Sequence, residues 1–505
     1  SLPPGAVGRL AVLSPSRPTT GAGRLRSRPN VVFYRDDGKE CSLLRPIAPT
    51  SATDVMEQRD HAWDRDAAAF YRDLAERCHS APDRGSAALD FVLVADQGDD
   101  DAVAKESYLD LATLGDLCHR TGGSLRYVAG DLASPEPWDR LRRHLLRVLR
   151  DRPAGYDCVV KLRCTAPLEA GPFLRHPGRL SQHASSLAQL SSPELEVPAL
   201  DADLALCAEV LLSGISTVRA AQACFQSAVL YTCPRTRRRR VRVSTLRVPT
   251  TPHIAPVFQG ADADAVACFL ARRAAEDVTK IYPKQEFLHG TAGPSGLVRA
   301  RRNLKETGEH ILACYRLHAS PARSSSDISP LLLPESLRLL PLFTLSLLKS
   351  PALRASRPPE AGKHWSVLPD PAADARSLRL HRLSRDPPHV LLPSLHPTIF
   401  SLDRLEDPGS EVGAVRRPAV PPGHGHPGSV PRPFVVTPVP LPASAASLDD
   451  AGAVLLDLDD VLYLLVGRAV PDSLWRSLFG DFPREGPAPP PAPDGTEMGE
   501  RVRTL

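Results

Sequence analysis

Residues Ala88–Ala95 read ALDFVLVA, and this nearly unbroken apolar run decides the fold class of the first part of the chain. A strand covered on both faces reads this way in a parallel sheet with helices on each side. Gly8–Leu13 (GRLAVL) and Ser124–Val128 predict two further strands. Apolar residues at helical spacing predict three helices, at Ala67–Cys78, Tyr108–Arg120 and Trp138–Arg150. The alternation of strands and helices predicts an α/β domain over residues 1–150.

The pattern changes after residue 150. Four strands are predicted, at Tyr156–Cys164, Leu204–Leu211, Ala223–Thr232 and Arg239–Val248. Several short strands separated by turns indicate a β-sandwich over residues 151–253, with a loop-like stretch at 166–200. Three helices follow, at 262–280, 297–317 and 335–349, and they predict an all-helical domain over residues 254–355.

Proline accounts for 52 of the 505 residues, about twice the usual share of ~5%. Because proline breaks helix interiors and central strands, we expect it to gather in linkers and insertions. The sequence predicts a linker at 356–385, a small α/β domain at 386–482 with a Pro/Gly insertion at 407–433, and a disordered tail at 483–505. The fold class expected for the whole chain is multidomain α+β.

Bulk properties narrow the functional classes. The net charge of +4 is nearly balanced, so we expect no nucleic-acid partner. The ten cysteines form no C-x-x-C pair, which leaves no visible zinc ribbon or redox motif, and reduced thiols in the cytosol are the simpler expectation. Neither a G-x-S-x-G elbow nor an H-E-x-x-H helix occurs, so we expect a binding protein and not an enzyme. The chain begins at Ser1 without a methionine, and we expect that further sequence precedes it.

Two basic features are candidate binding sites. Lys161 and Arg163 lie two residues apart on a predicted strand and therefore share one face, where two cations can hold a carboxylate-bearing peptide. The alternative is an ordinary solvated face of the sheet. The second feature is an arginine cluster that could bind an anionic partner, or could simply form a solvated hairpin turn. Its central members are Arg237, Arg238, Arg239 and Arg240.

Several strings occur in an order that resembles the cargo-adaptor subunit of the COPII inner coat. Phe70–Ala75 (FYRDLA) resembles a helix of that family, and Tyr156–Thr165, with KLRCT at its end, resembles one of its strands. Phe225–Thr232 (FQSAVLYT), followed by Arg239–Val243 (RRVRV), is similar to a family hairpin. Leu333–Phe343 (LPESLRLLPLF) and His396–Phe400 (HPTIF) look like later family segments. The collinear order of these strings over nearly the whole chain makes the resemblance fairly specific.

The resemblance implies an architecture and a role. Residues 1–150 would be the C-terminal part of a von Willebrand-A-like trunk, and 386–482 a gelsolin-like module. The family selects cargo and SNAREs for transport from the endoplasmic reticulum to the Golgi by binding acidic sorting signals. Lys161 and Arg163 resemble positions that contact those signals, and Leu230 resembles part of the apolar wall beside them. The family typically has arginine where this chain has Lys161, which weakens a bidentate grip.

The resemblance also implies partners and a location. The expected partners are a GTPase-activating sister coat subunit, a Sar-type small GTPase, cargo tails and SNAREs, with peripheral contact to the membrane. The chain would be cytoplasmic, on the endoplasmic reticulum membrane and COPII vesicles. The family's zinc ribbon would lie upstream of Ser1, so no cofactor is expected in this chain.

Two alternative functions stay open at this point. The chain could be the GTPase-activating sister subunit, which has a related architecture and supplies an arginine to the GTPase. It could also be an anion-binding scaffold that uses the arginine cluster around residues 235–242.

Overall fold

The computed structural model describes most of the chain and divides it into two compact units, Ser1–Pro388 and His389–Leu505. The predicted insertion at 407–433 falls outside the described residues except at 415–416, and the predicted tail falls wholly outside them. The described residues are 2–28, 37–47, 58–79, 81, 83–95, 108–130, 135–150, 153–174, 194–212, 221–280, 296–318, 333–354, 373–402, 415–416, 434–458 and 462–480.

A three-stranded parallel sheet forms the first layer of unit Ser1–Pro388, as the apolar runs predict. Its strands lie in the order β1, β2, β3, with the bounds Val7–Ser14, Ser86–Ala95 and Leu125–Ala129. Four helices belong to the same region, namely α1 (Asp37–Leu43), α2 (Gln58–Arg77), α4 (Leu111–Thr121) and α5 (Pro135–Arg150). Helix α2 begins at Gln58. The sequence predicts its start nine residues later, at Ala67.

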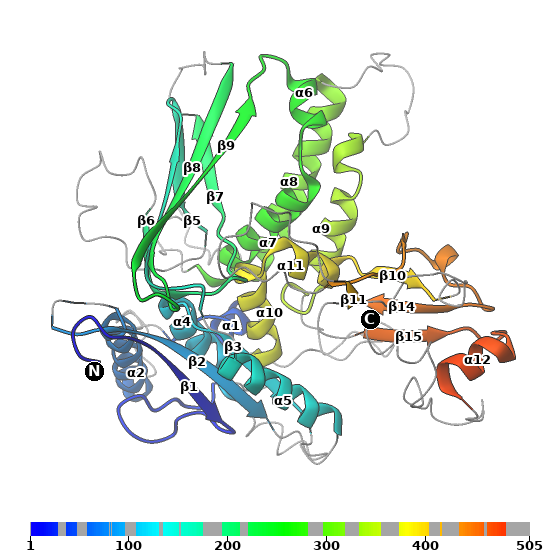
Figure 1. The fold of residues 1–505 in the computed structure, drawn as a ribbon. Coiled ribbons are helices and arrows are strands. Elements are labelled where there is room, and N and C mark those ends of the chain that lie inside the picture. The colour runs from blue at the N-terminus through cyan, green and yellow to red at the C-terminus, as the bar shows by residue number, and fades with distance from the viewer. Residues whose placement is uncertain are drawn as a thin grey trace. The chain divides into compact units, whose positions relative to one another are not determined.

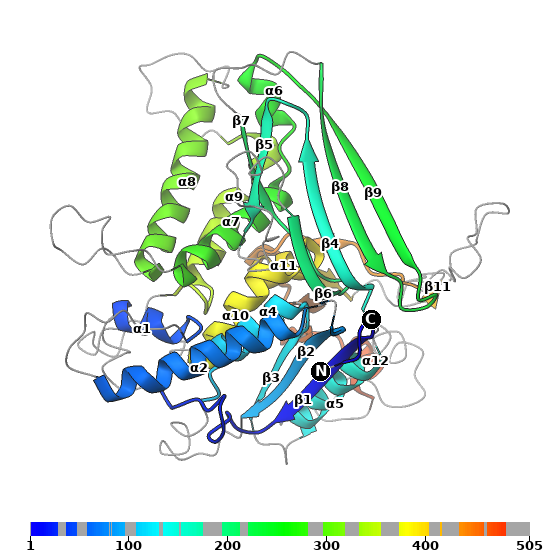
Figure 2. The same cartoon turned by 90° about the vertical axis from the view of Figure 1, so that its left-hand side faces the viewer.

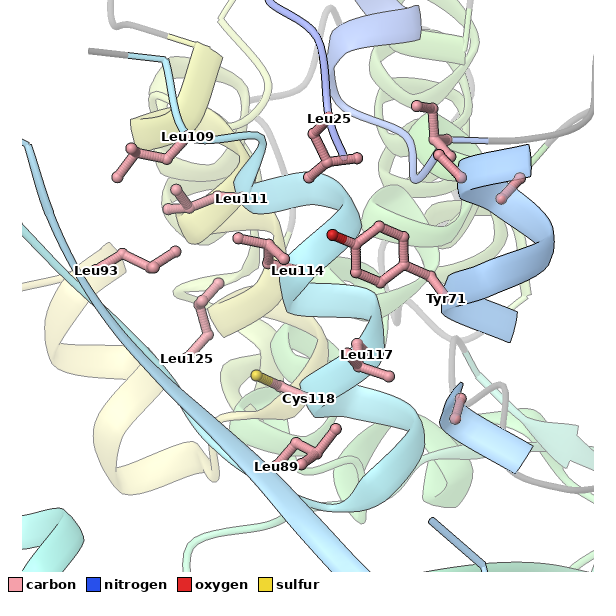
Figure 3. Packing of buried hydrophobic residues seen from close by; sticks show 14 of the residues in the cluster. Leu25, Tyr71, Leu89, Leu93, Leu109, Leu111, Leu114, Leu117, Cys118 and Leu125 are labelled. Carbon is pink, nitrogen blue, oxygen red and sulfur yellow. The ribbon is translucent and has the colours of Figure 1, made fainter. Parts of the chain in front are cut away.

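Each face of this sheet buries its own apolar cluster. Figure 3 shows the larger one, where Leu89, Leu93 and Leu125 of the strands meet Leu114 and Leu117 of α4. On the other face, Val92, Val94 and Val128 pack against Leu141 of α5. Burial on both faces explains why β2 reads as a continuous apolar run.

The second layer is a four-stranded antiparallel sheet in the order β6, β4, β8, β9 (Figure 2). The strands are β4 (Gly155–Cys164), β6 (Glu194–Leu200), β8 (Gln222–Thr232) and β9 (Arg239–Pro249), and a separate pair is formed by β5 (Leu168–Phe173) and β7 (Ala208–Leu212). Cys158, Val160 and Val197 lie in a core on one face of the larger sheet. The expectation of a loop at 166–200 is wrong, because β5 and β6 both lie within that range.

Helices α6 to α10 complete unit Ser1–Pro388. Their bounds are α6 (Ile254–Gln259), α7 (Ala263–Thr279), α8 (Gly296–His318), the 3-10 turn η4 (Glu335–Leu337), α9 (Leu340–Lys349) and α10 (Ala373–Arg385). Asp262 caps α7 by accepting hydrogen bonds from the backbone N–H groups of Asp264 and Ala265. The helix predicted at 335–349 is instead a 3-10 turn followed by α9.

Helix α10 occupies the end of the segment that the sequence assigns to a linker. Nine of its thirteen residues are buried, including Asp374, Arg376 and Arg385. The sequence misleads here because such polar residues usually mark a solvated segment. The buried arginines of this helix have partners: Arg376 meets Glu40 of α1, and Arg385 meets Asp201.

Unit His389–Leu505 contains a smaller sheet in the order β13, β10, β14, β15 (Figure 1). Its described elements are α11 (Pro388–Leu395), β10 (Thr398–Ser401), β11 (Val415–Arg416), β12 (Phe434–Val435), β13 (Pro440–Leu441), the turn η5 (Ala445–Ser447), β14 (Ala453–Asp457), β15 (Leu462–Val466) and α12 (Asp472–Phe479). Leu455 of β14 packs with Leu474 and Leu478 of α12. The domain boundaries expected from the sequence stay predictions.

The buried carboxyl of Asp374 gives unit Ser1–Pro388 a specific pH dependence. It accepts hydrogen bonds from the backbone N–H groups of Leu109 (2.6 Å) and Leu111 (2.9 Å). Burial raises the pKa of Asp374 to about 6, although these two hydrogen bonds and Arg28 act to lower it; Asp110 raises it further. A carboxyl whose folded pKa exceeds its unfolded value binds its proton more tightly when folded. Its stabilising contribution is therefore complete below pH 3.8 and lost as the pH rises through about 6.

We expect this contribution to reach about 3 kcal/mol, since each pKa unit corresponds to ~1.4 kcal/mol. Urea unfolding of the wild-type chain and of Asp374→Asn between pH 4 and pH 7 measures it. The variant lacks the titrating group, so the stability of the wild type relative to Asp374→Asn should fall as the pH rises. If the difference in unfolding free energy between the wild type and Asp374→Asn stays constant over this pH range, the carboxyl of Asp374 does not titrate near pH 6.

Candidate functional site

The sheet β6–β4–β8–β9 brings Lys161, Arg163 and Leu230 to one face. Lys161 lies opposite Ala228, and Arg163 lies opposite Gln226. Leu230 pairs with Val159 of β4, two residues before Lys161. Because side chains alternate along a strand, Val159, Lys161 and Arg163 point to the same side, opposite to the buried Cys158 and Val160. The prediction that Lys161 and Arg163 share a face is confirmed, and Leu230 joins them from the neighbouring strand.

The two cations have different surroundings. The Lys161 Nζ atom lies 3.2 Å from Glu194 Oε2 of β6, and both side chains are about one-third exposed. Arg163 is exposed and has no hydrogen bond or ion pair among the described residues. Its guanidinium can therefore receive an external carboxylate directly, whereas Lys161 must first leave Glu194.

An apolar strip lies beside these cations. Leu230 is flanked by Val159 of β4 and by Val241 of β9, whose side chain is 61% exposed. Val243, two residues further along β9, is also largely exposed. The face can thus accept an apolar side chain next to a carboxylate. The sequence does not point to Glu194, Val159 or Val241, because a local pattern does not show which strands pair.

The arginine cluster lies on the hairpin that connects β8 to β9. The turn closes through backbone hydrogen bonds from Cys233 N to Arg238 O (3.0 Å) and from Arg237 N to Cys233 O (2.8 Å). Arg239 is tied to Asp157 Oδ2 at 3.0 Å. Among the described residues, the side chains of Arg237, Arg238 and Arg240 form no hydrogen bond or ion pair. Three of the four predicted arginines are therefore available to an anion, and Arg239 is engaged within the sheet.

Cys233, at the start of the same turn, is a feature that sequence reasoning missed. Hydrogen bonds from the Thr236 hydroxyl and from the backbone of Thr236 and Arg235 lower the pKa of this half-buried thiol to about 7, and Arg240 contributes. The signal available in the sequence is a cysteine next to several arginines, which favours a thiolate.

No metal site emerges from the described residues, where no three His, Cys, Asp or Glu side chains converge as ligands. The ten cysteines are free thiols. Burial raises the pKa of Cys158 to about 12. Among the described helices, none combines the length and apolar character needed to cross a membrane.

The chain is similar in sequence and structure to known proteins. Residues 262–361 match the family model described as the Sec23/Sec24 helical domain. The human protein transport protein Sec24B is 27% identical over 476 residues, which cover 94% of this chain. Over nearly its whole length the chain is therefore similar to Sec24 proteins. The bovine Sec24A is 28% identical over 476 residues, and sec24 of Aspergillus clavatus is 27% identical over 478.

The chain is shorter than these relatives. It covers 30% of human Sec24B, 34% of bovine Sec24A and 42% of the Aspergillus clavatus protein. The crystal structure of the human COPII-coat protein Sec24c superposes with a TM-score of 0.67 at 20% identity, over 98% of this chain and 53% of that chain. This superposition shows that the two chains share a fold.

Proposed function

We propose that this chain acts in the COPII coat as a cargo adaptor for transport from the endoplasmic reticulum to the Golgi. It would bind acidic sorting signals on cargo tails and SNAREs. The observation that carries the proposal is the common face of Lys161, Arg163 and Leu230, in a chain whose relatives are named protein transport proteins. That name supports a binding role over an enzymatic one.

The chemistry of the face supports a division of roles. Arg163 offers a planar guanidinium that can hold a carboxylate through two parallel hydrogen bonds. Lys161 offers a point charge that becomes available when it exchanges Glu194 for the ligand. Leu230, with Val159 and Val241, offers apolar surface to a leucine or methionine of the signal. Such a small contact binds weakly, and many copies in a coat would compensate through avidity.

The partners and location that the resemblance implies are part of this proposed role. The chain would dock to a GTPase-activating sister subunit and act beside a Sar-type GTPase, on the cytoplasmic side of the endoplasmic reticulum membrane. The curated relatives compared above carry the name Sec24, which supports the adaptor over the sister subunit. We assign residues 151–253 to a β-sandwich and 386–482 to a gelsolin-like module within this proposal.

Replacing Arg163 by alanine should weaken binding of an acidic cargo-tail peptide about tenfold or more. A hydrogen bond to a charged group contributes ~1.5–3 kcal/mol, and ~1.4 kcal/mol corresponds to a factor of ten. Lys161→Ala should have a smaller effect, because the lysine is already engaged by Glu194. Glu194→Gln should strengthen binding, since it frees the lysine. Fluorescence anisotropy with a labelled peptide measures all three.

The matched control is Arg338→Ala, which removes an exposed arginine of the helical region paired with Glu335. It should leave binding unchanged. A second control is the same peptide with its acidic residues replaced by their amides. Equal binding of the acidic and neutralised peptides, or full binding by the Arg163→Ala/Lys161→Ala double variant, would count against a cargo site on this face.

Anion binding by the hairpin arginines is a second candidate function. The sequence alone favours a solvated turn for this cluster. The observation in favour of binding is that Arg237, Arg238 and Arg240 have no intramolecular ion pair among the described residues, while Arg239 does. Arg237 and Arg238 on the turn, together with Arg240 at the start of β9, would attract an anionic surface, and this attraction would weaken with salt.

A further inference from the structure

A cavity of about 540 Å³ lies within unit Ser1–Pro388, away from the Lys161–Arg163 face. Helices α2, α4, α7 and α10 all contribute to its lining, together with the segment that follows α1. Its volume falls in the range of ~300–1,000 Å³ that is usual for small-molecule sites. Much of its wall is apolar, with Leu44, Tyr71, Leu111, Leu117 and Phe173 among the lining residues.

Several polar groups of the lining are already used. Arg120 is paired with Asp116 at 2.7 Å, and Thr113 Oγ1 accepts from the backbone N–H of Ile47 at 3.0 Å. Thr279 donates to the carbonyl of Ala275, and Ser384 donates to that of Leu380. These groups have little capacity left for a ligand.

Two other polar groups that line the cavity have no partner among the described residues. Ser377 is only 6% exposed, and its Oγ atom is buried without a hydrogen bond. Glu276, on α7, has a buried Oε2 atom that is likewise without a hydrogen bond. A buried polar atom left in this state costs ~1–3 kcal/mol, more if it is charged. The cavity thus presents an unsatisfied anion and an unsatisfied hydroxyl.

Arg45 supplies the opposite charge on the same lining. Its Nε atom donates to the carbonyl of Val278 at 3.1 Å, but no carboxylate of the described residues pairs with its guanidinium. Burial lowers the pKa of Arg45, and the neighbouring Arg299 lowers it further while Cys41 raises it. The guanidinium is therefore a cation that lacks compensation in a partly buried position.

We propose that this cavity binds a small zwitterion with an apolar body, whose ammonium contacts Glu276 and whose carboxylate contacts Arg45. Ser377 completes the site by hydrogen bonding to the ligand. A molecule of a single charge satisfies one of the two ionic groups and leaves the other buried. Two kinds of ligand combine an ammonium, a carboxylate and an apolar body, namely a free apolar amino acid and an apolar dipeptide. The site is separate from the proposed cargo face and does not depend on it.

Isothermal titration calorimetry on the full 505-residue chain tests the proposal with four probes. L-leucine and the dipeptide Leu-Leu carry both charges, N-acetyl-L-leucine lacks the ammonium, and leucinamide lacks the carboxylate. At least one zwitterion should bind saturably, and both singly charged probes should bind at least tenfold more weakly. Whichever of L-leucine and Leu-Leu binds with the higher affinity shows whether the cavity takes an amino acid or a dipeptide. Absence of binding by both, or equal binding of N-acetyl-L-leucine, would overturn the proposal.

Glu276→Gln keeps the shape of the side chain and removes its charge, so it should weaken zwitterion binding about tenfold or more. The matched control is Glu309→Gln on α8, an exposed glutamate near Lys305 that does not line the cavity. If Glu276→Gln fails to fold, Ser377→Ala takes its place and should also weaken binding. Unchanged affinity in the folded variant would refute the assigned contact.

Discussion

Replacing Glu40 by glutamine should lower the free energy of unfolding of unit Ser1–Pro388 by about 3–5 kcal/mol. Glu40 of α1 and Arg376 of α10 form an ion pair in which both side chains are only 2% exposed. Arg376 also donates to the carbonyl of Arg354 at 2.9 Å. Removal of the carboxylate charge leaves the guanidinium buried without its counterion, and desolvation of a lone charge is the costly outcome.

Urea unfolding followed by circular dichroism measures this effect, with the transition of unit Ser1–Pro388 fitted separately. The matched control is Glu335→Gln, which breaks an exposed pair with Arg338 and should cost less than 1 kcal/mol. A Glu40→Leu/Arg376→Met double variant replaces the pair by apolar groups and should recover most of the loss. Equal effects of Glu40→Gln and Glu335→Gln would show that the pair does not stabilise the fold.

The local elements of the fold could be predicted where burial leaves a direct pattern in the sequence. Strand β2 is covered on both faces, so its apolar run is almost continuous, and the sequence locates it to within two residues. Helices α7 and α8 follow their 3.6-residue pattern and differ from prediction by one residue at each end. In these elements, local sequence and tertiary environment agree.

Helix α10 could not be predicted, because its environment is created by distant segments. Its polar residues are buried against partners such as Leu109, Glu40 and Asp201, which lie between 184 and more than 300 residues away in the sequence. A local pattern rule treats such residues as solvated. Only the assembled tertiary structure shows the partners of Asp374, Arg376 and Arg385.

The candidate cargo face also has one feature that the sequence predicts and one that it does not. The period of two along a strand predicts that Lys161 and Arg163 share a side, and this follows from backbone geometry alone. The ion pair between Lys161 and Glu194 could not be predicted, because it depends on β6 pairing with β4. The sequence therefore locates the cations but not the anion that pairs with Lys161.

Replacing Gly122 by alanine should destabilise unit Ser1–Pro388 by about 3 kcal/mol or more. Gly122 ends α4 with φ of 74°, and its N–H bonds to the carbonyls of Cys118 and His119. This left-handed conformation costs ~1–2 kcal/mol for a residue with a side chain. In addition, a Cβ atom at this position would lie 1.8 Å from the carbonyl oxygen of Ala199 in β6. Since that atom belongs to the backbone, α4 and β6 must separate, and their packing is lost.

Gly308→Ala provides a matched control in which the same change should have the opposite sign. Gly308 lies within α8, and a Cβ atom there would lie no closer than 3.9 Å to the nearest atom, on Thr344. Alanine is a better helix former by ~0.5–1 kcal/mol, so Gly308→Ala should stabilise the protein. Urea unfolding of the two variants compares them directly. If Gly122→Ala costs no more than 1 kcal/mol, the close approach of α4 to β6 is not a requirement of this fold.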